Sequence, residues 1–278
     1  MRIFSFLTRL AAALLFIACR APAATEIPFD FQGGMIWLKV AVVGQMEPLS
    51  FLLDSGAGAS VVDVDTARCL GLKLGRSQSV QGVHTRSVAY RVDGFRGAVS
   101  GVPAPSSVLA LDLSSVSNGL RRRIDGLLGA DFLRERIVQI DYAAQRIAVL
   151  SRNELNIAGA EILPLARRND GVCVRVSIAG QAGEWMRVDT GCNSALQWVM
   201  SKTKARKLGP TSVALAGKAV RSVHASVRIG SSRFNDVETG LHTAQIFPGE
   251  AGLLGNGLLS RFTVTIDVPR NRLILAQR

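Results

Sequence analysis

Two short triplets each place a carboxylate directly after an apolar run. Residues 49–62 read LSFLLDSGAGASVV, and residues 185–199 read WMRVDTGCNSALQWV. Asp54 and Asp189 therefore stand at the ends of predicted buried strands. If the two carboxylates meet in a buried site, they cannot both ionise and must share one proton. One would then act as a base towards a bound water, and the other as an acid towards a carbonyl oxygen.

An internal repeat relates the two triplets. Residues 127–150 and 253–276 align without a gap, and eight of the 24 aligned positions are identical. In both halves, a predicted strand–hairpin–strand precedes the triplet, and a short helical pattern ending in Leu-Gly follows it, at 66–71 and 204–209. The shared order predicts two lobes, 26–152 and 162–278, each supplying one carboxylate about a pseudo-two-fold axis.

The other residues of each triplet have predicted supporting roles. Gly56 and Gly191 allow the backbone to turn tightly beside the carboxylates. The hydroxyl groups of Ser55 and Thr190 are expected to hydrogen-bond across to the opposite loop and to hold the pair rigid.

Two further aspartates, Asp141 and Asp267, begin D-x-x-x-x-R stretches in the predicted terminal hairpins. A cross-hairpin ion pair or a turn cap explains them better than catalysis does.

On these residues the chain resembles the retropepsin–pepsin superfamily of aspartic proteases, and most closely bacterial exported retropepsin-like members with two lobes in one chain. The two triplets carry the resemblance, together with DGLLG at 125–129 and AGLLG at 251–255. It implies an all-β fold of two β-barrel lobes with the active-site cleft between them. It also implies an aspartic endopeptidase without a cofactor, in which Asp54 and Asp189 are catalytic. The leucines of the two Leu-Leu-Gly segments would support the loops.

The resemblance further implies a β-hairpin flap over the cleft, and the chain offers two candidates. One is residues 79–85, around Gly82 and Val83, and the other is residues 213–218, around Gly217. Neither contains the Tyr-x-Gly of the pepsin flap. Which hairpin covers substrate stays open, and an ordinary surface hairpin is the alternative for each.

Ala57 and Cys192 follow the two triplets and are candidate residues of the cleft wall. Neither side chain has a hydroxyl group that would favour the charged carboxylate. We therefore expect a pH optimum less acidic than that of pepsin, roughly 4.5–6.5. Whether Cys192 pairs with Cys173 stays open, because the sequence does not place their Cβ atoms.

The N-terminal residues 1–23 have the layout of a secretory signal peptide, with arginines before an apolar core and a small-residue cleavage site ending at Ala23. The apolar core is too short for a spanning helix. We expect export to the periplasm or the medium, with lipoprotein processing at Cys19 as the less favoured alternative.

Composition limits the class of protein. Hydrophobic residues make up 48% of the 278 positions and charged residues 19%, which suits a folded protein with a large core. The net charge of +12 reads as a solvated basic surface, because no aromatic interleaving, zinc spacing or phosphate-binding loop supports nucleic-acid binding. The three separated histidines predict no metal site.

Three functions remain to be separated. The first is an endopeptidase acting on proteins or peptides, as a monomer that contains its own pseudo-dimer. The second is a non-catalytic protein that binds a peptide in the same two-lobed cleft. In the third, the lobes pair between chains, which the near-equal lobes and the linker of about ten residues disfavour.

Overall fold

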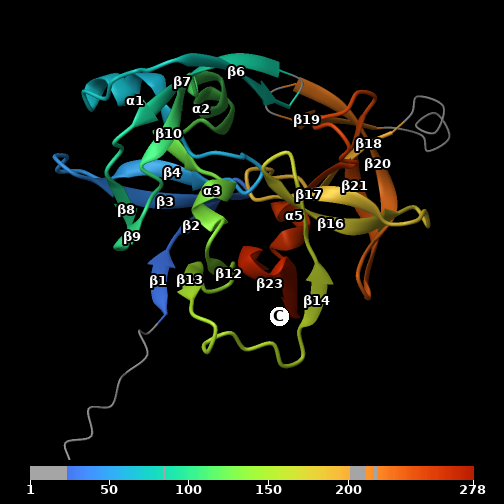
Figure 1. The fold of residues 1–278 in the computed structure, drawn as a ribbon. Coiled ribbons are helices and arrows are strands. Elements are labelled where there is room, and N and C mark those ends of the chain that lie inside the picture. The colour runs from blue at the N-terminus through green and yellow to red at the C-terminus, as the bar shows by residue number, and fades with distance from the viewer. Residues whose placement is uncertain (1–23, 84, 201–210, 216–217) are drawn as a thin grey trace, which may run out of the picture.

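The computed structural model describes residues 24–83, 85–200, 211–215 and 218–278, with side chains described outside 211–220. It is built almost entirely from β-strands with a few short helices (Figure 1). The first half of the chain lies on one side of the view and the second half on the other. The predicted all-β, two-lobed fold is confirmed.

A ten-stranded sheet, here called the first lobe, comes from residues 30–128. Its order is β6-β7-β10-β5-β11-β4-β3-β8-β9, with β2 paired to β3. β11 lies between β4, to which it is parallel, and β5, to which it is antiparallel. Because β4 also pairs with β3 on its other side, it lies inside the sheet and not at an edge. The strands are β2 (Asp30–Gln32), β3 (Met35–Val42), β4 (Leu49–Leu53), β5 (Val61–Asp63), β6 (Ser77–Gly82), β7 (Thr85–Asp93), β8 (Gly97–Val99), β9 (Val102–Pro103), β10 (Ser107–Leu111) and β11 (Gly126–Leu128).

An eight-stranded sheet, the second lobe, comes from residues 166–255. Its order is β15-β16-β17-β22-β18-β21-β20-β19, with a further pairing of β16 to β20. Here β17 runs parallel to β22, as β4 does to β11 in the first lobe. The strands are β15 (Ala166–Arg168), β16 (Gly171–Ile178), β17 (Glu184–Asp189), β18 (Leu196–Val199), β19 (Thr211–Leu215), β20 (Lys218–Ile229), β21 (Ser232–His242) and β22 (Gly252–Gly255).

A six-stranded sheet joins the two lobes and lies below them in Figure 1. Its order, β1-β13-β12-β23-β24-β14, places the terminal hairpins of the two repeats side by side about a central β12–β23 pair. The pairing Val138↔Ile266 and Ile140↔Val264 buries four apolar side chains at that centre. The strands are β1 (Thr25–Pro28), β12 (Ile137–Asp141), β13 (Arg146–Leu150), β14 (Glu161–Pro164), β23 (Phe262–Asp267) and β24 (Arg272–Gln277).

The described helices are short, and two of them lie at corresponding places in the repeat. Helices α3 (Ala130–Leu133) and α5 (Asn256–Leu259) each begin directly after the glycine of a Leu-Leu-Gly segment. The first lobe adds α1 (Val64–Cys69) and α2 (Ser114–Leu120), and a 3-10 turn covers Val268–Arg270. The helical pattern predicted at 204–209 lies outside the described residues. In the part of the chain that the structure describes, no helix has the length and apolar character needed to cross a membrane.

Asp141 and Asp267, the aspartates of the two D-x-x-x-x-R stretches, stabilise the turns of the terminal hairpins. Asp267 is fully buried and its Oδ2 accepts hydrogen bonds from Arg270 and Arg272, at 3.1 and 2.6 Å. Asp141 instead caps its turn through the backbone N–H groups of residues 143 and 144, while Arg146 pairs with Glu26 on β1. Asp267 also caps its turn by accepting from the Arg270 N–H, so both aspartates are turn caps and the one in the second repeat forms ion pairs as well.

Candidate active site

Each triplet begins where a central strand of its lobe ends. β4 ends at Leu53 and β17 ends at Asp189. The backbone N–H of Asp54 donates to the carbonyl of Leu128 at 2.8 Å, and Asp189 lies opposite Gly255 in the parallel pairing of β17 with β22. The Leu-Leu-Gly segments therefore lie beside the triplets and fix where each strand stops.

The glycine that closes each Leu-Leu-Gly segment lies against the following loop. A Cβ at Gly129 would overlap the backbone of Ala57 and Ala59, and one at Gly255 would overlap the backbone of Cys192 and Ser194. Only glycine leaves room for the loops to pack this closely. Of the four leucines, Leu128, Leu253 and Leu254 are buried and Leu127 is partly buried.

Four hydrogen bonds lock the two triplets together across the lobes. Ser55 Oγ donates to the Val188 carbonyl at 2.8 Å and accepts from the Thr190 N–H at 3.0 Å. In the same way, Thr190 Oγ1 donates to the Leu53 carbonyl at 2.8 Å and accepts from the Ser55 N–H at 2.9 Å. Both side chains are fully buried. Each hydroxyl thus uses its donor and one acceptor site on the opposite lobe, which fixes the relative position of the two loops.

This lock brings the two carboxyl groups into one site. The side chains of Asp54 and Asp189 hydrogen-bond to each other. A Cβ at Gly56 would overlap the Asp189 carboxyl group, and a Cβ at Gly191 would overlap that of Asp54. The glycine of each triplet is therefore required by the aspartate of the other lobe.

The two aspartates differ in their hydrogen bonds. Among the described residues, Asp54 Oδ1 accepts from the backbone N–H groups of Gly56 and Ala57, both at 3.0 Å, whereas Asp189 Oδ1 accepts from one backbone N–H, that of Gly191, at 2.9 Å. Asp189 is buried and Asp54 is half-buried. Donors that point at a carboxylate stabilise its charged form. The local geometry thus favours the negative charge on Asp54.

Burial raises the pKa of both carboxyl groups. For Asp54 the backbone N–H donors, the hydrogen bond from Asp189 and the charge of Arg187 oppose this rise. For Asp189 the negative charge of Asp54 adds to burial, and its pKa lies well above the ordinary range. These directions agree with the hydrogen bonds, and both favour the proton on Asp189.

The residues after the triplets contribute differently. Ala57 is half-buried and uses its backbone N–H on Asp54, whereas Cys192 is buried with its Sγ 3.0 Å from Ser194 Oγ. Cys69, Cys173 and Cys192 are all free thiols. Burial raises the pKa of the Cys173 and Cys192 thiols to about 12, so both stay protonated near neutral pH.

The two flap candidates are both β-hairpins. β6 pairs with β7 from Ser77↔Tyr90 to Gly82↔Thr85, with Val83 exposed at the turn. β19 pairs with β20 from Thr211↔Ser222 to Leu215↔Lys218. Gly217 lies outside the described residues.

Two buried charged residues close to the pair were not anticipated from the sequence. Arg187 lies two residues before Asp189, and Glu250 lies in the loop before β22; they are 1% and 3% exposed. Arg187 Nε and Nη2 donate to the two Glu250 carboxylate oxygens at 2.7 and 2.6 Å. The only signal in the sequence is an arginine inside the apolar run WMRVD.

A third missed residue, Asn256, begins α5 and links three segments. Its Nδ2 donates to the carbonyl oxygens of Gly34 and Thr190, at 2.8 and 2.7 Å, and its Oδ1 accepts from the Tyr142 hydroxyl at 2.7 Å. It ties the second triplet to the β2–β3 turn of the first lobe.

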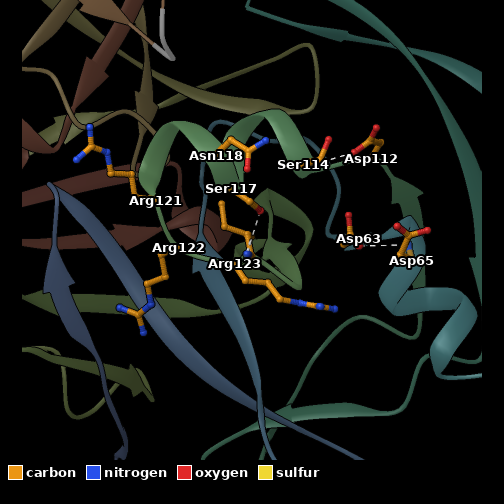
Figure 2. A pocket seen from close by; sticks show the side chains of 10 residues that line it. Asp63, Asp65, Asp112, Ser114, Ser117, Asn118, Arg121, Arg122 and Arg123 are labelled. Atoms are coloured by element: carbon orange, nitrogen blue, oxygen red, sulfur yellow. Dashed lines mark hydrogen bonds between the residues drawn. The ribbon is translucent and has the colours of Figure 1, made fainter.

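A separate recess of about 590 Å³ lies in the first lobe between α1 and α2. Figure 2 shows the carboxylates of Asp63, Asp65 and Asp112 on one side of it and Arg121 and Arg122 on the other. The acidic groups have structural partners. Asp63 caps α1 and Asp112 accepts from the Ser114 N–H at 2.8 Å, while Asp65 pairs with Arg68. These three carboxylates therefore have structural roles in the recess.

Among the residues that the structure describes, no group of three or more His, Cys, Asp or Glu side chains is placed to hold a metal ion.

Comparison with known proteins gives one finding. A family model described as aspartyl protease matches residues 38–132, a range that includes β4, the first triplet and the first Leu-Leu-Gly segment. A search of the curated proteins finds no match.

Proposed function

We propose that the chain is an aspartic endopeptidase whose catalytic pair is Asp54 and Asp189, and the match of residues 38–132 to the aspartyl protease family model supports this. One observation carries the proposal: the two carboxyl groups lie in hydrogen-bonding contact in a buried site, each against the glycine of the opposite triplet. A coupled pair of carboxyl groups with one proton is the arrangement that general acid–base hydrolysis needs.

The unequal surroundings assign a role to each aspartate. Asp54, with two backbone donors, carries the charge and takes a proton from a water held between the carboxyl groups. The water oxygen attacks the carbonyl carbon of a peptide bond, and Asp189 gives its proton to the carbonyl oxygen. In the second step, Asp54 returns its proton to the amide nitrogen as the C–N bond breaks, and Asp189 recovers its proton from the hydroxyl group.

The triplet neighbours serve this pair. Ser55 and Thr190 keep the loops rigid, and Gly56 and Gly191 allow the opposite carboxyl group to approach. Ala57 and Cys192 remain candidate cleft residues, and the β6–β7 turn at Gly82 and Val83 is the candidate flap of the first lobe. We propose that peptides bind between the two lobes, under one of the two hairpins.

We also propose that the chain is exported, with residues 1–23 removed, and that it works as a monomer. The shared six-stranded sheet supports pairing of the lobes within one chain, because its central β12–β23 pair combines strands from both repeats.

The test is cleavage of an unfolded protein by residues 24–278, from pH 3 to 8, by wild type, Asp54→Asn and Asp189→Asn. Asp112→Asn is the matched control, since Asp112 is an exposed carboxylate in the recess. We expect each active-site variant to lose at least about a thousandfold in kcat, and the control to lose nothing. A statine-type inhibitor should block the wild type.

A folded monomer that binds peptides without cleaving them at any pH would contradict the proposal and favour the non-catalytic binding protein. Activity that survives in Asp54→Asn would equally contradict it. Size-exclusion chromatography with light scattering separates pairing within a chain from pairing between chains.

A further inference from the structure

The buried guanidinium of Arg187 is surrounded on all sides by specific partners. Both Glu250 oxygens accept from it, and the Phe247 ring lies 3.7 Å from its Cζ. The β15–β16 turn closes over it, where Nη2 donates to the Asn169 carbonyl at 3.2 Å. A Cβ at Gly171 would overlap the guanidinium. Such an enclosure leaves the side chain one position.

The fixed guanidinium reaches across to the first lobe. Arg187 Nη1 donates to the Gly56 carbonyl at 2.8 Å. The N–H of the same peptide unit belongs to Ala57 and donates to Asp54 Oδ1 at 3.0 Å. A charged donor on a carbonyl polarises the peptide and strengthens the hydrogen bond made by its N–H. Arg187 therefore acts on Asp54 through one peptide unit.

The opposite peptide lacks this arrangement. The Cys192 N–H donates to the backbone carbonyl of Asp189 at 3.3 Å, as the Ala57 N–H also does to that of Asp54 at 3.1 Å. Among the described residues, however, the Gly191 N–H is the one backbone donor to the Asp189 carboxylate. The position that corresponds to Arg187, two residues before the first aspartate, is Leu52 in an apolar cluster. The guanidinium thus breaks the symmetry of the two lobes at the catalytic pair.

We propose that Arg187, held by Glu250, is a positioning residue that makes Asp54 the base of the pair by fixing and polarising the Gly56–Ala57 peptide. This inference rests on the proposed function for its effect on turnover, but not for its effect on where the proton resides.

The electrostatics agree with this geometry. The charged groups that act on Asp54 are Asp189 and Arg187, and the positive charge of Arg187 lowers the pKa of both aspartates against the effect of burial. The neutral thiol of Cys192 lies beside Asp189. Glu250 neutralises the arginine within the protein and so limits its effect.

The test replaces the ion pair by the apolar pair of the first lobe, Arg187→Leu with Glu250→Ile. In the folded double variant we expect the acidic limb of kcat/KM to move to higher pH, because Asp54 loses its strengthened donor. We expect kcat to fall about tenfold through the misplaced loop, with KM nearly unchanged, since Arg187 is buried away from substrate. Arg272→Leu, at an ion pair outside the site, should leave the limb in place.

Glu250→Gln gives the opposite sign. It keeps the shape of the pair but leaves the charge of Arg187 unbalanced, so the acidic limb should move to lower pH. A folded double variant with the wild-type limb overturns the inference. If the double variant does not fold, a Glu250→Gln limb that stays or moves up overturns it.

The ionisation order in the wild type provides a readout without turnover. Carbon-13 NMR of the aspartate carboxyl groups should show Asp54 losing its proton at a lower pH than Asp189. In the double variant the difference between these two pH values should be smaller. If no peptide is cleaved but this order holds and responds to the double variant, the proposed function fails and the inference stands. Asp189 ionising first would overturn it.

Discussion

The two lobes differ most at one pair of equivalent positions beside the aspartates. In the first lobe Leu52 and Ile124 belong to one apolar cluster, each 1% exposed. In the second lobe the corresponding residues are Arg187 and Glu250, equally buried and joined by two short hydrogen bonds. One repeated framework thus holds either an apolar pair or an ion pair at the same place.

The difference shows that the ion pair is not needed to build a lobe. Buried ion pairs often contribute no more stability than the apolar side chains that could replace them. The ion pair adds a contact between the lobes, because the Arg187 guanidinium hydrogen-bonds to the Gly56 carbonyl of the other lobe. A leucine cannot form this hydrogen bond. The duplication provides the scaffold, and the different residues at these two positions make the two triplet loops unequal.

Breaking the pair on one side should have the largest effect on stability. Arg187→Leu leaves the Glu250 charge buried without its partner, and we expect unfolding free energy to fall by about 3–5 kcal/mol. Adding Glu250→Ile should restore most of this loss. Urea unfolding at pH 7 measures Arg187→Leu, Glu250→Ile and the double variant. Losses that simply add up in the double variant would contradict this account.

The hydroxyl groups of Ser55 and Thr190, which lock the two triplets together, should contribute equally to stability. Thr190→Val leaves the Leu53 carbonyl and the Ser55 N–H without these hydrogen bonds. Ser55→Ala likewise removes the hydrogen bonds of the Val188 carbonyl and the Thr190 N–H. Each loss should cost about 2–3 kcal/mol, measured by the same unfolding experiment. A difference between the two variants larger than about 1 kcal/mol would show that the lock is asymmetric.

The two aspartates should respond differently to pH. A carboxyl group whose pKa is raised by folding adds stability below its unfolded pKa, and this is lost as pH rises through its folded pKa. Because the pKa of Asp189 is the more strongly raised, Asp189→Asn should remove this alkaline loss of stability. Asp54→Asn should leave more of it.

Thermal unfolding between pH 4 and 9 measures that pair of variants. Melting temperatures of Asp189→Asn and Asp54→Asn that follow the same pH dependence would contradict the assignment of the proton to Asp189.

The smallest difference in stability between corresponding variants of the two repeats is expected at the terminal hairpins. Arg272→Gln weakens a pair with the fully buried Asp267 and should cost about 1 kcal/mol. Arg146→Gln removes an exposed pair with Glu26 and should cost less than about 0.5 kcal/mol. Denaturant midpoints compare the two, and an equal loss would mean that burial of the aspartate does not matter.

Much of the fold could be predicted because the repeat and the alternation of apolar residues are local signals. The Leu-Leu-Gly segments and the terminal hairpins stand at fixed spacings in both halves, and the structure builds them as β11, β22 and two strand pairs. The joint six-stranded sheet could not be predicted, since pairing Val138 with Ile266 requires knowing how the two repeats meet.

The motifs of the candidate site could be predicted from the sequence, but the residues that surround the two aspartates could not. The two triplets are visible in the sequence, and their meeting follows if the repeats pack about an axis. Arg187 gives no such signal, because a single arginine in a strand is typical of an exposed position and its partner lies 63 residues away. Which aspartate holds the proton depends on these long-range contacts, and so no local pattern contains it.

The most direct test of the account is the titration of the Asp54 and Asp189 carboxyl groups by carbon-13 NMR in the wild-type chain. We predict two separate titration steps from one coupled pair, with Asp189 retaining its proton well above the ordinary pH range for aspartate. Two independent titrations near the ordinary aspartate value of about 3.9 would show that the carboxyl groups do not share a site, and would contradict the central claim.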